Sequence, residues 1–360
     1  MISRPAPPSR GALTACIAAC VLAGGCLTAA RMKADIRSGA ARGAIVEGVP
    51  FVRQRRNTCG PAALASVMLH SGVETSEDKI SEALGTLEKG GAVTFDLALH
   101  PRDEGLITIQ RYEVADEELR AAVRSGVPPV IMLGGILSII GRYHYAVITG
   151  YDESRRAWLL HYGVKPDVVM GFERLRKLRG HADGWALYVS NPDHRPAGLP
   201  PELHLEMGLA AEKLGRPEAA RFHYSHATWT PEAPQAMMNM SNVALGGESY
   251  ARAEELLRKA LDLKPDFPAA KNNLAWALLK QKKALDEAEH LAREAARDAK
   301  TRPFALDTLA DILEAAGRAD EAARVRGEIE KLKAAPRTGA RASRDGEPDA
   351  RSLEAPAPPR

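Results

Sequence analysis

The chain lacks an excess of charge of either sign. Its 49 lysines and arginines are matched by 46 aspartates and glutamates, which gives a formal net charge of +3 over 360 residues. A protein that binds nucleic acid or an acidic membrane surface through its own charge usually carries a basic surplus or a basic patch. The composition therefore predicts no nucleic-acid partner, and the length allows two domains.

The sequence also lacks a 20-residue apolar run after residue 26 and a Gly-x-x-x-x-Gly-Lys-Ser/Thr motif. A membrane-spanning helix needs ~20 apolar residues. The glycine-rich motif is the one that holds nucleotide phosphates. We therefore expect neither the membrane part nor the nucleotide-binding part of a transporter in this sequence, and nothing in it points to a cofactor.

Cysteine is scarce, and three of the four cysteines lie in the first 26 residues. Residues 1–25 have a basic start and a short apolar core with small residues at its end, which is typical of a secretory signal. The residues before Cys26 resemble the lipobox of bacterial lipoproteins, although Ala23 stands where leucine is usual. Cys20 also fits the pattern but leaves a shorter apolar core. We expect lipid on Cys26; a plain signal peptide and a soluble product are the alternative.

The same resemblance places the protein in the bacterial cell envelope. Leu27 follows the expected lipidated cysteine, and by resemblance to bacterial lipoproteins it points to the outer membrane, with the chain facing the periplasm. Removal of residues 1–25 and acylation of Cys26 would leave Cys59 as the remaining thiol. An unpaired cysteine in an oxidising compartment is a candidate reactive group.

Cys59 lies where a polar turn passes into a helix. The apolar run 49–52 predicts a strand before the turn, and Cys59 falls at the expected N-cap. Gly60 permits a tight bend, Pro61 suits the first helical position, and Gly72 is a plausible stop. The free N–H groups and the positive dipole end of a helix start favour a thiolate over a thiol, and the thiolate is the nucleophile.

Two more side chains complete a catalytic pattern. Gln54 lies five residues before Cys59, so its amide could join the Cys59 backbone N–H in an oxyanion hole. His144 begins a predicted strand and shares a face with Ala146 by the period of two. Alone, such a cysteine or histidine is more often structural. Together they favour nucleophilic catalysis, because the fold can bring a helix start and a strand together.

The elements around these residues predict an α+β domain. Helical patterns come first and antiparallel strands with a hairpin turn come second. The expected helices are 76–87 and 117–125, and the expected strands are 127–133, 143–150, 157–161 and 185–189.

These motifs resemble the bacteriocin-leader-processing cysteine peptidases, a papain-like family that cleaves after double glycines. The resemblance rests on Gln54, on Cys59-Gly60-Pro61 opening a helix, and on the strand that begins His144-Tyr145-Ala146-Val147. It implies a papain-like peptidase domain over residues 47–192 that acts on a peptide or protein. It also implies that Cys59 is the nucleophile, His144 the general base and acid, and Gln54 the oxyanion donor.

One position departs from the family pattern. The family usually has Asp-Pro at the end of the strand that returns from the histidine strand, and this chain has His161-Tyr162-Gly163 there. A neutral His161 could orient His144 but would stabilise its imidazolium less than a carboxylate does. The alternatives are a degenerate site, or a zinc site of Cys59, His144 and His161.

Residues 200–334 carry an internal repeat. Ala219, Ala253, Ala288 and Ala322 lie in matching contexts, at spacings of 34, 35 and 34. This period is similar to that of tetratricopeptide repeats, which are stacked helix pairs. We expect three to four units that form an all-α solenoid whose concave surface holds a protein partner or peptide; a generic helical bundle is the alternative.

Two segments outside these domains look unstructured. Residues 27–46 are small and polar without a periodic apolar face, so we expect a tether. Residues 335–360 contain almost no large apolar residues, so we expect a disordered tail.

The sequence thus predicts an envelope-anchored cysteine peptidase with a helical-repeat domain for a substrate or partner. An inactive papain-like domain within a scaffold lipoprotein is the alternative. Acyl transfer by the same cysteine and histidine is a third possibility.

Overall fold

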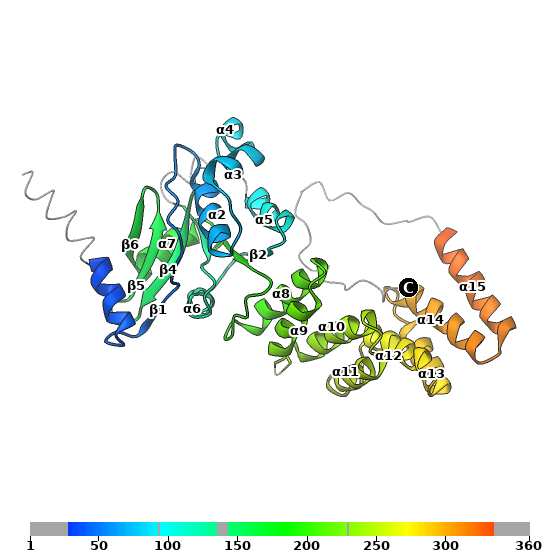
Figure 1. The fold of residues 1–360 in the computed structure, drawn as a ribbon. Helices are drawn as coiled ribbons and strands as arrows, with labels where there is room; N and C mark the ends of the chain where they lie inside the picture. The colour runs from blue at the N-terminus through cyan, green and yellow to red at the C-terminus, as the bar shows by residue number, and fades with distance from the viewer. Residues whose placement is uncertain (1–27, 93, 135–142, 229, 335–360) are drawn as a thin grey trace, which may run out of the picture. The chain divides into compact units, whose positions relative to one another are not determined.

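The computed structural model describes residues 28–92, 94–134, 143–228 and 230–334 (Figure 1). Its contacts divide the chain into two units, Met1–Leu203 and His204–Arg360, and each is considered by itself. The predicted signal segment, Cys26 and the predicted tail at 335–360 lie outside the described residues. None of the helices within the described ranges is long and apolar enough to cross a membrane.

The first unit is built on a seven-stranded antiparallel sheet. Six strands follow the order β2-β7-β3-β4-β5-β6, and β1 pairs with the far end of β4. The strands are β1 (Gly43–Ile45), β2 (Ile107–Arg111), β3 (Val130–Leu133), β4 (His144–Asp152), β5 (Ala157–Tyr162), β6 (Lys165–Gly171) and β7 (Ala186–Ser190). Together with the helices this is the expected α+β class.

One face of the sheet is covered by α2 (Cys59–His70) and α5 (Thr94–Asp103), while α3 (Glu77–Ala83) packs on α2 and α4 (Thr86–Lys89) packs on α3. Leu64, Val67 and Met68 of α2 pack on strand residues such as Tyr145 and Val147. Burial on nearly every side explains why α2 is rich in small and apolar residues rather than amphipathic. The helix ends as predicted, with Gly72 at a φ of 87°.

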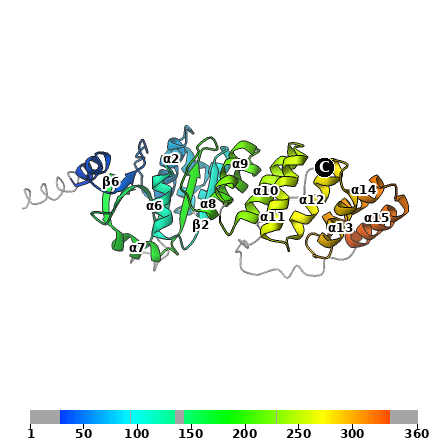
Figure 2. The ribbon, with the colours of Figure 1, turned by 90° about the horizontal axis from the view of Figure 1, so that it is seen from below.

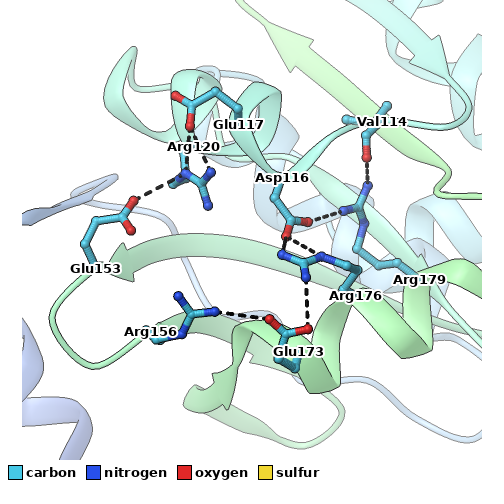
Figure 3. A network of polar contacts seen from close by, with 9 residues as sticks. All are labelled: Val114, Asp116, Glu117, Arg120, Glu153, Arg156, Glu173, Arg176 and Arg179. Atoms are coloured by element: carbon cyan, nitrogen blue, oxygen red, sulfur yellow. Dashed lines mark hydrogen bonds and ion pairs between the residues drawn. The ribbon is translucent and has the colours of Figure 1, made fainter.

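The opposite face is covered by α6 (Asp116–Arg124) and α7 (Phe172–Gly180) (Figure 2). The ring of Phe172 lies 5.2 Å from that of Trp158, a fully buried residue of β5. A network of arginines and carboxylates joins α6 to α7 and to the β4–β5 turn (Figure 3). This network holds the two helices against each other on the sheet.

The expected tether at 27–46 is corrected by the structure. Residues 28–37 form a helix, and residues 43–45 form β1, which pairs with β4. Ala29 and Met32 are buried against Leu159, with Ile36 packed beside them. These three residues recur at helical spacing, so the segment does have an apolar face, and the sheet supplies its partner.

The strand expected at 49–52 is also corrected. That segment belongs to no strand, although the Val52 N–H lies 3.4 Å from the Ser66 hydroxyl of α2. Pro50 has no N–H to donate to a ladder. A short strand, β1, forms earlier instead, at 43–45, and pairs with β4. Strands β2 and β6 were not predicted, and the helix expected at 76–87 is divided into α3 and α4.

The second unit consists of helix pairs, as the 34-residue period predicts. The pairs are α8 (Pro201–Lys213) with α9 (Pro217–His226), α10 (Ala233–Gly246) with α11 (Tyr250–Leu263), α12 (Pro268–Lys280) with α13 (Leu285–Ala295), and α14 (Arg302–Ala315) with α15 (Ala319–Ala334). The four repeated alanines fall on the second helix of each pair, and all are buried. A shared apolar core runs through the last three pairs, so stacking buries what one pair cannot.

Candidate active site at the start of helix α2

The polar turn before α2 is fixed by its own side chains. Thr58, rather than Cys59, is the N-cap residue, and its hydroxyl accepts a hydrogen bond from the Arg55 backbone N–H at 2.8 Å. Asn57 adopts a φ of 64°, a left-handed conformation that asparagine tolerates. Cys59 is therefore the first residue of the helix rather than its N-cap, so the helix begins one residue earlier than predicted. Pro61 is the third helical residue. The Cys59 N–H still belongs to the first turn, which has no intrahelical acceptor.

Gly60 allows the start of α2 to approach its neighbours closely. A Cβ atom at this position would lie 2.7 Å from the Cβ of Ala92 and 3.3 Å from the Tyr145 ring. Tyr145 also donates a hydrogen bond to the Ala92 carbonyl at 3.4 Å. Glycine after the cysteine therefore seats the helix start on β4.

A salt bridge ties the turn to α3. The Arg55 guanidinium lies 3.0 Å from the Glu77 carboxylate and also contacts Asp78. Glu77 is nearly buried and accepts a hydrogen bond from Ser81. Arg55 and Glu77 are far apart in the chain and only the fold brings them together, so no local sequence pattern predicts this pair. The bridge restrains the segment that carries Gln54.

Three of the four predicted site residues line one pocket. Gln54, Cys59 and His161 form part of its wall, together with Phe51, Tyr145 and Tyr162. Cys59 is a free cysteine that is partly exposed. Gln54 and Cys59 therefore border the same small pocket, and an oxyanion hole beside a nucleophile requires that proximity.

His161 enters this pocket because of an irregularity in the β4–β5 hairpin. Ile148 pairs with Leu160, whereas Gly150 pairs with Leu159, so Thr149 is an extra residue in β4. Such a bulge shifts every later pairing by one residue. His161 consequently pairs with Val147, whose side chain packs under α2. Without the bulge His161 would lie on the same face as His144.

His161 has one hydrogen bond and one aromatic contact. Its Nε2 lies 3.1 Å from the Val49 carbonyl oxygen, and its ring lies 5.4 Å from that of Phe51 in an edge-on arrangement. Its Nδ1 is buried without a hydrogen-bond partner. Burial lowers the pKa of His161, while the Val49 carbonyl and Asp167 act to raise it. The ring is therefore neutral near neutral pH.

His144 lies at the first position of β4, next to this pocket but not among the residues that line it. Its ring contacts that of Tyr162 at 5.4 Å, and Tyr162 does line the pocket. Burial lowers the pKa of His144, and its Nδ1 has no hydrogen-bond partner. Among the described residues, no hydrogen bond joins His144 to Cys59 or to His161. Cys59, His144 and His161 also do not form a metal-binding group within the described ranges.

Two family models match the chain. Residues 46–162 match the Peptidase_C39 like family, and residues 234–267 match the tetratricopeptide repeat. The first unit carries a C39-like peptidase domain. The second unit carries tetratricopeptide-type repeats. The C39-like match covers the start of α2, both predicted histidines and the β4–β5 hairpin.

Solved structures that resemble the C39-like domain include a C39-like peptidase from Bacillus anthracis, with 16% identity over 42% of this chain and 98% of its own, at a TM-score of 0.37. The peptidase domain of Streptococcus ComA, a bifunctional ABC transporter involved in quorum sensing, shows 20% identity over 40% of this chain and 98% of its own, at a TM-score of 0.34. For the repeats, MamA of AMB-1 shows 19% identity over 37% of this chain and 79% of its own, at a TM-score of 0.34. No curated protein matches the chain.

Proposed function

We propose that this protein is a cysteine peptidase of the cell envelope that cleaves a peptide or protein by thiolate attack from Cys59. The observation that carries the proposal is the partly exposed Cys59 at the first turn of α2, in one pocket with the Gln54 amide and an imidazole. A buried structural cysteine would need neither an amide donor nor a neighbouring base.

The chemistry follows from these groups. An imidazole accepts the thiol proton of Cys59, and the thiolate sulfur attacks the carbonyl carbon of the scissile peptide bond. The Cys59 N–H and the Gln54 amide donate hydrogen bonds to the oxyanion that forms. The imidazolium then gives its proton to the leaving amine as the C–N bond breaks, and water hydrolyses the thioester. Transfer of the acyl group to another acceptor would use the same first half-reaction.

The test is a comparison of envelope peptides by mass spectrometry in cells that express the wild-type chain or Cys59→Ala. We expect one set of cleaved peptides to disappear in the variant while its uncleaved precursor accumulates, because alanine has no nucleophile. Ser71→Ala at the end of the same helix serves as a matched control, since its hydroxyl donates to the Val67 carbonyl at 2.8 Å and the residue does not line the Cys59 pocket. Identical peptide sets from wild type and Cys59→Ala would contradict the proposal.

A scaffold lipoprotein with a silent peptidase domain is the second candidate. It is favoured by one observation: the described residues show no hydrogen bond from His144, the family's catalytic histidine, to Cys59. In that case the Cys59→Ala variant would change no peptide, whereas removal of the stacked repeats would abolish capture of the partner. The repeats serve as the binding surface in both candidates, for a protein partner or a peptide substrate.

Anchoring through Cys26 is part of the proposal and rests on the sequence pattern. Growth with an alkyne-labelled fatty acid should label the wild-type chain, and Cys26→Ser should lose that label completely. Cys20→Ser is the matched control and should keep it, because cleavage before Cys26 removes that residue. Labelling that is lost with Cys20→Ser and kept with Cys26→Ser would move the anchor to position 20.

A further inference from the structure

We propose that Glu77 is a positioning residue of the candidate active site: through Arg55 it holds the turn that carries Gln54, and so fixes the oxyanion hole. This inference rests on the proposed function, because it concerns the oxyanion hole of the same nucleophile. Glu77 does not line the Cys59 pocket, so it acts through the turn and not on a substrate.

The position of Gln54 depends on the backbone around it. Gln54 lines the pocket, and none of the described residues forms a hydrogen bond with its side chain. On one side, the Val52 N–H lies 3.4 Å from the Ser66 hydroxyl of α2. On the other side, the Arg55 N–H donates to the Thr58 hydroxyl at 2.8 Å. Gln54 therefore lies between two tethered residues, and Arg55 is the one next to it.

The side chain of Arg55 extends this tether to α3. Its Nε lies 3.0 Å from the Glu77 carboxylate, whose side chain is only 8% exposed. Ser81 donates a hydrogen bond to the same carboxylate at 3.1 Å. Asp78 also contacts Arg55, but its side chain is 74% exposed. A nearly buried carboxylate depends on its counter-charge far more than an exposed one does, so Glu77 is the partner that fixes the guanidinium.

Glu77 is itself fixed relative to Cys59. It is the first residue of α3, and Ile80 of that helix is buried in the same core as Leu64 of α2. Cys59 is the first residue of α2. The two donors of the proposed oxyanion hole come from different segments, since the Cys59 N–H belongs to the helix and the Gln54 amide belongs to the turn. The salt bridge joins the turn to the packed helices and thereby fixes the separation of the two donors.

Two small probes that react with Cys59 separate the oxyanion hole from the thiolate. With p-nitrophenyl acetate, a bond forms between sulfur and the carbonyl carbon and an electron pair moves onto the carbonyl oxygen. The C–O bond then breaks and p-nitrophenolate leaves, which gives an acetyl thioester. An oxyanion hole stabilises this reaction. With iodoacetamide, the thiolate displaces iodide from a saturated carbon, so no oxyanion forms.

The test measures both rates in the full chain, after subtraction of the rates of Cys59→Ala. We expect Glu77→Gln to slow acylation by p-nitrophenyl acetate about tenfold, because a misplaced donor stabilises the oxyanion less. Alkylation by iodoacetamide should stay within about twofold of wild type, because it needs no oxyanion hole. Asp78→Asn is the matched control on the same guanidinium and should keep both rates within about twofold. In a Gln54→Ala background, Glu77→Gln should slow acylation no further, because the group that it positions is absent.

The inference is overturned if Glu77→Gln leaves acylation unchanged, slows alkylation as much as acylation, or keeps its full effect in the Gln54→Ala background. If Glu77→Gln does not fold, Arg55→Gln replaces it with the same expected rates. That variant loses an exposed side chain and keeps the backbone hydrogen bond to Thr58. A wild-type chain that p-nitrophenyl acetate acylates no faster than Cys59→Ala would instead remove the proposed function itself.

Discussion

Asp116→Ala is expected to lower the free energy of unfolding of the first unit by about 3–5 kcal/mol, because it leaves a buried guanidinium without its counter-charge. Arg179 is almost fully buried, and its Nη1 donates to the Asp116 carboxylate at 3.0 Å. Burial lowers the pKa of Arg179, and Asp116 opposes that shift. The Val114 carbonyl accepts from Arg179 at 2.6 Å but carries no full charge (Figure 3).

Glu173→Ala is the matched control from the same network. Glu173 pairs with Arg156 at 3.1 Å and with Arg176 at 2.9 Å, but both pairs are exposed to solvent. Exposed pairs contribute about 0–1 kcal/mol. Urea unfolding of the full chain followed by tryptophan fluorescence measures both variants, since Trp158 and Trp185 lie in the core of this unit. An equal loss of unfolding free energy in the two variants would mean that a group other than Asp116 compensates the charge of the Arg179 guanidinium.

Acidification is expected to destabilise the first helix pair of the repeats through His204. The Nδ1 atoms of His204 and His223 lie 3.0 Å apart, and both rings are buried. One ring must donate and the other accept, so a second proton breaks the bond. Burial, aided by the stacked His226, lowers the pKa of His204 to about 4.

The lowered pKa of His204 determines how the free energy of unfolding depends on pH. The unfolded chain binds a proton at about pH 6.5, well before the folded chain does. The contribution of His204 is therefore complete above that pH and is lost as the pH falls toward 4, by at most about 3 kcal/mol. His204→Gln keeps a hydrogen-bonding side chain but does not titrate. The difference in unfolding free energy between wild type and this variant should shrink steadily from pH 7 to pH 4, and a constant difference would refute the assignment.

The features predicted correctly are those that depend on residue spacing or on neighbouring residues in the sequence. The 34-residue spacing of alanines identifies the helix pairs, because each alanine sits where two helices must approach closely. The helix after Cys59 and its end at Gly72 follow from local backbone chemistry. The helix at 28–37 was missed because its three apolar residues look weak alone, and their partner Leu159 is far away in the chain.

The arrangement of the histidines was beyond local patterns. One extra residue in β4, Thr149, decides whether His161 faces α2 or the opposite face of the sheet. No residue type in the sequence predicts that bulge. Strand β6 was not predicted, because proline and aspartate, here Pro166 and Asp167, are rare in strands. Pairing with β5 nevertheless makes this segment a strand, and Asp167 adopts a left-handed φ of 55° within it. The candidate residues were therefore identifiable from the sequence, but their partners were not.

The packing of residues 28–37 also limits how far an anchored protein could reach. Ala29 is held on the sheet and comes three residues after Cys26, a distance of at most about 10 Å of extended chain. With a lipid on Cys26, the C39-like domain would therefore have no long flexible linker to the membrane. The candidate site would then stay within one domain diameter of the bilayer, and under the proposed function a substrate peptide would have to reach it at the membrane surface.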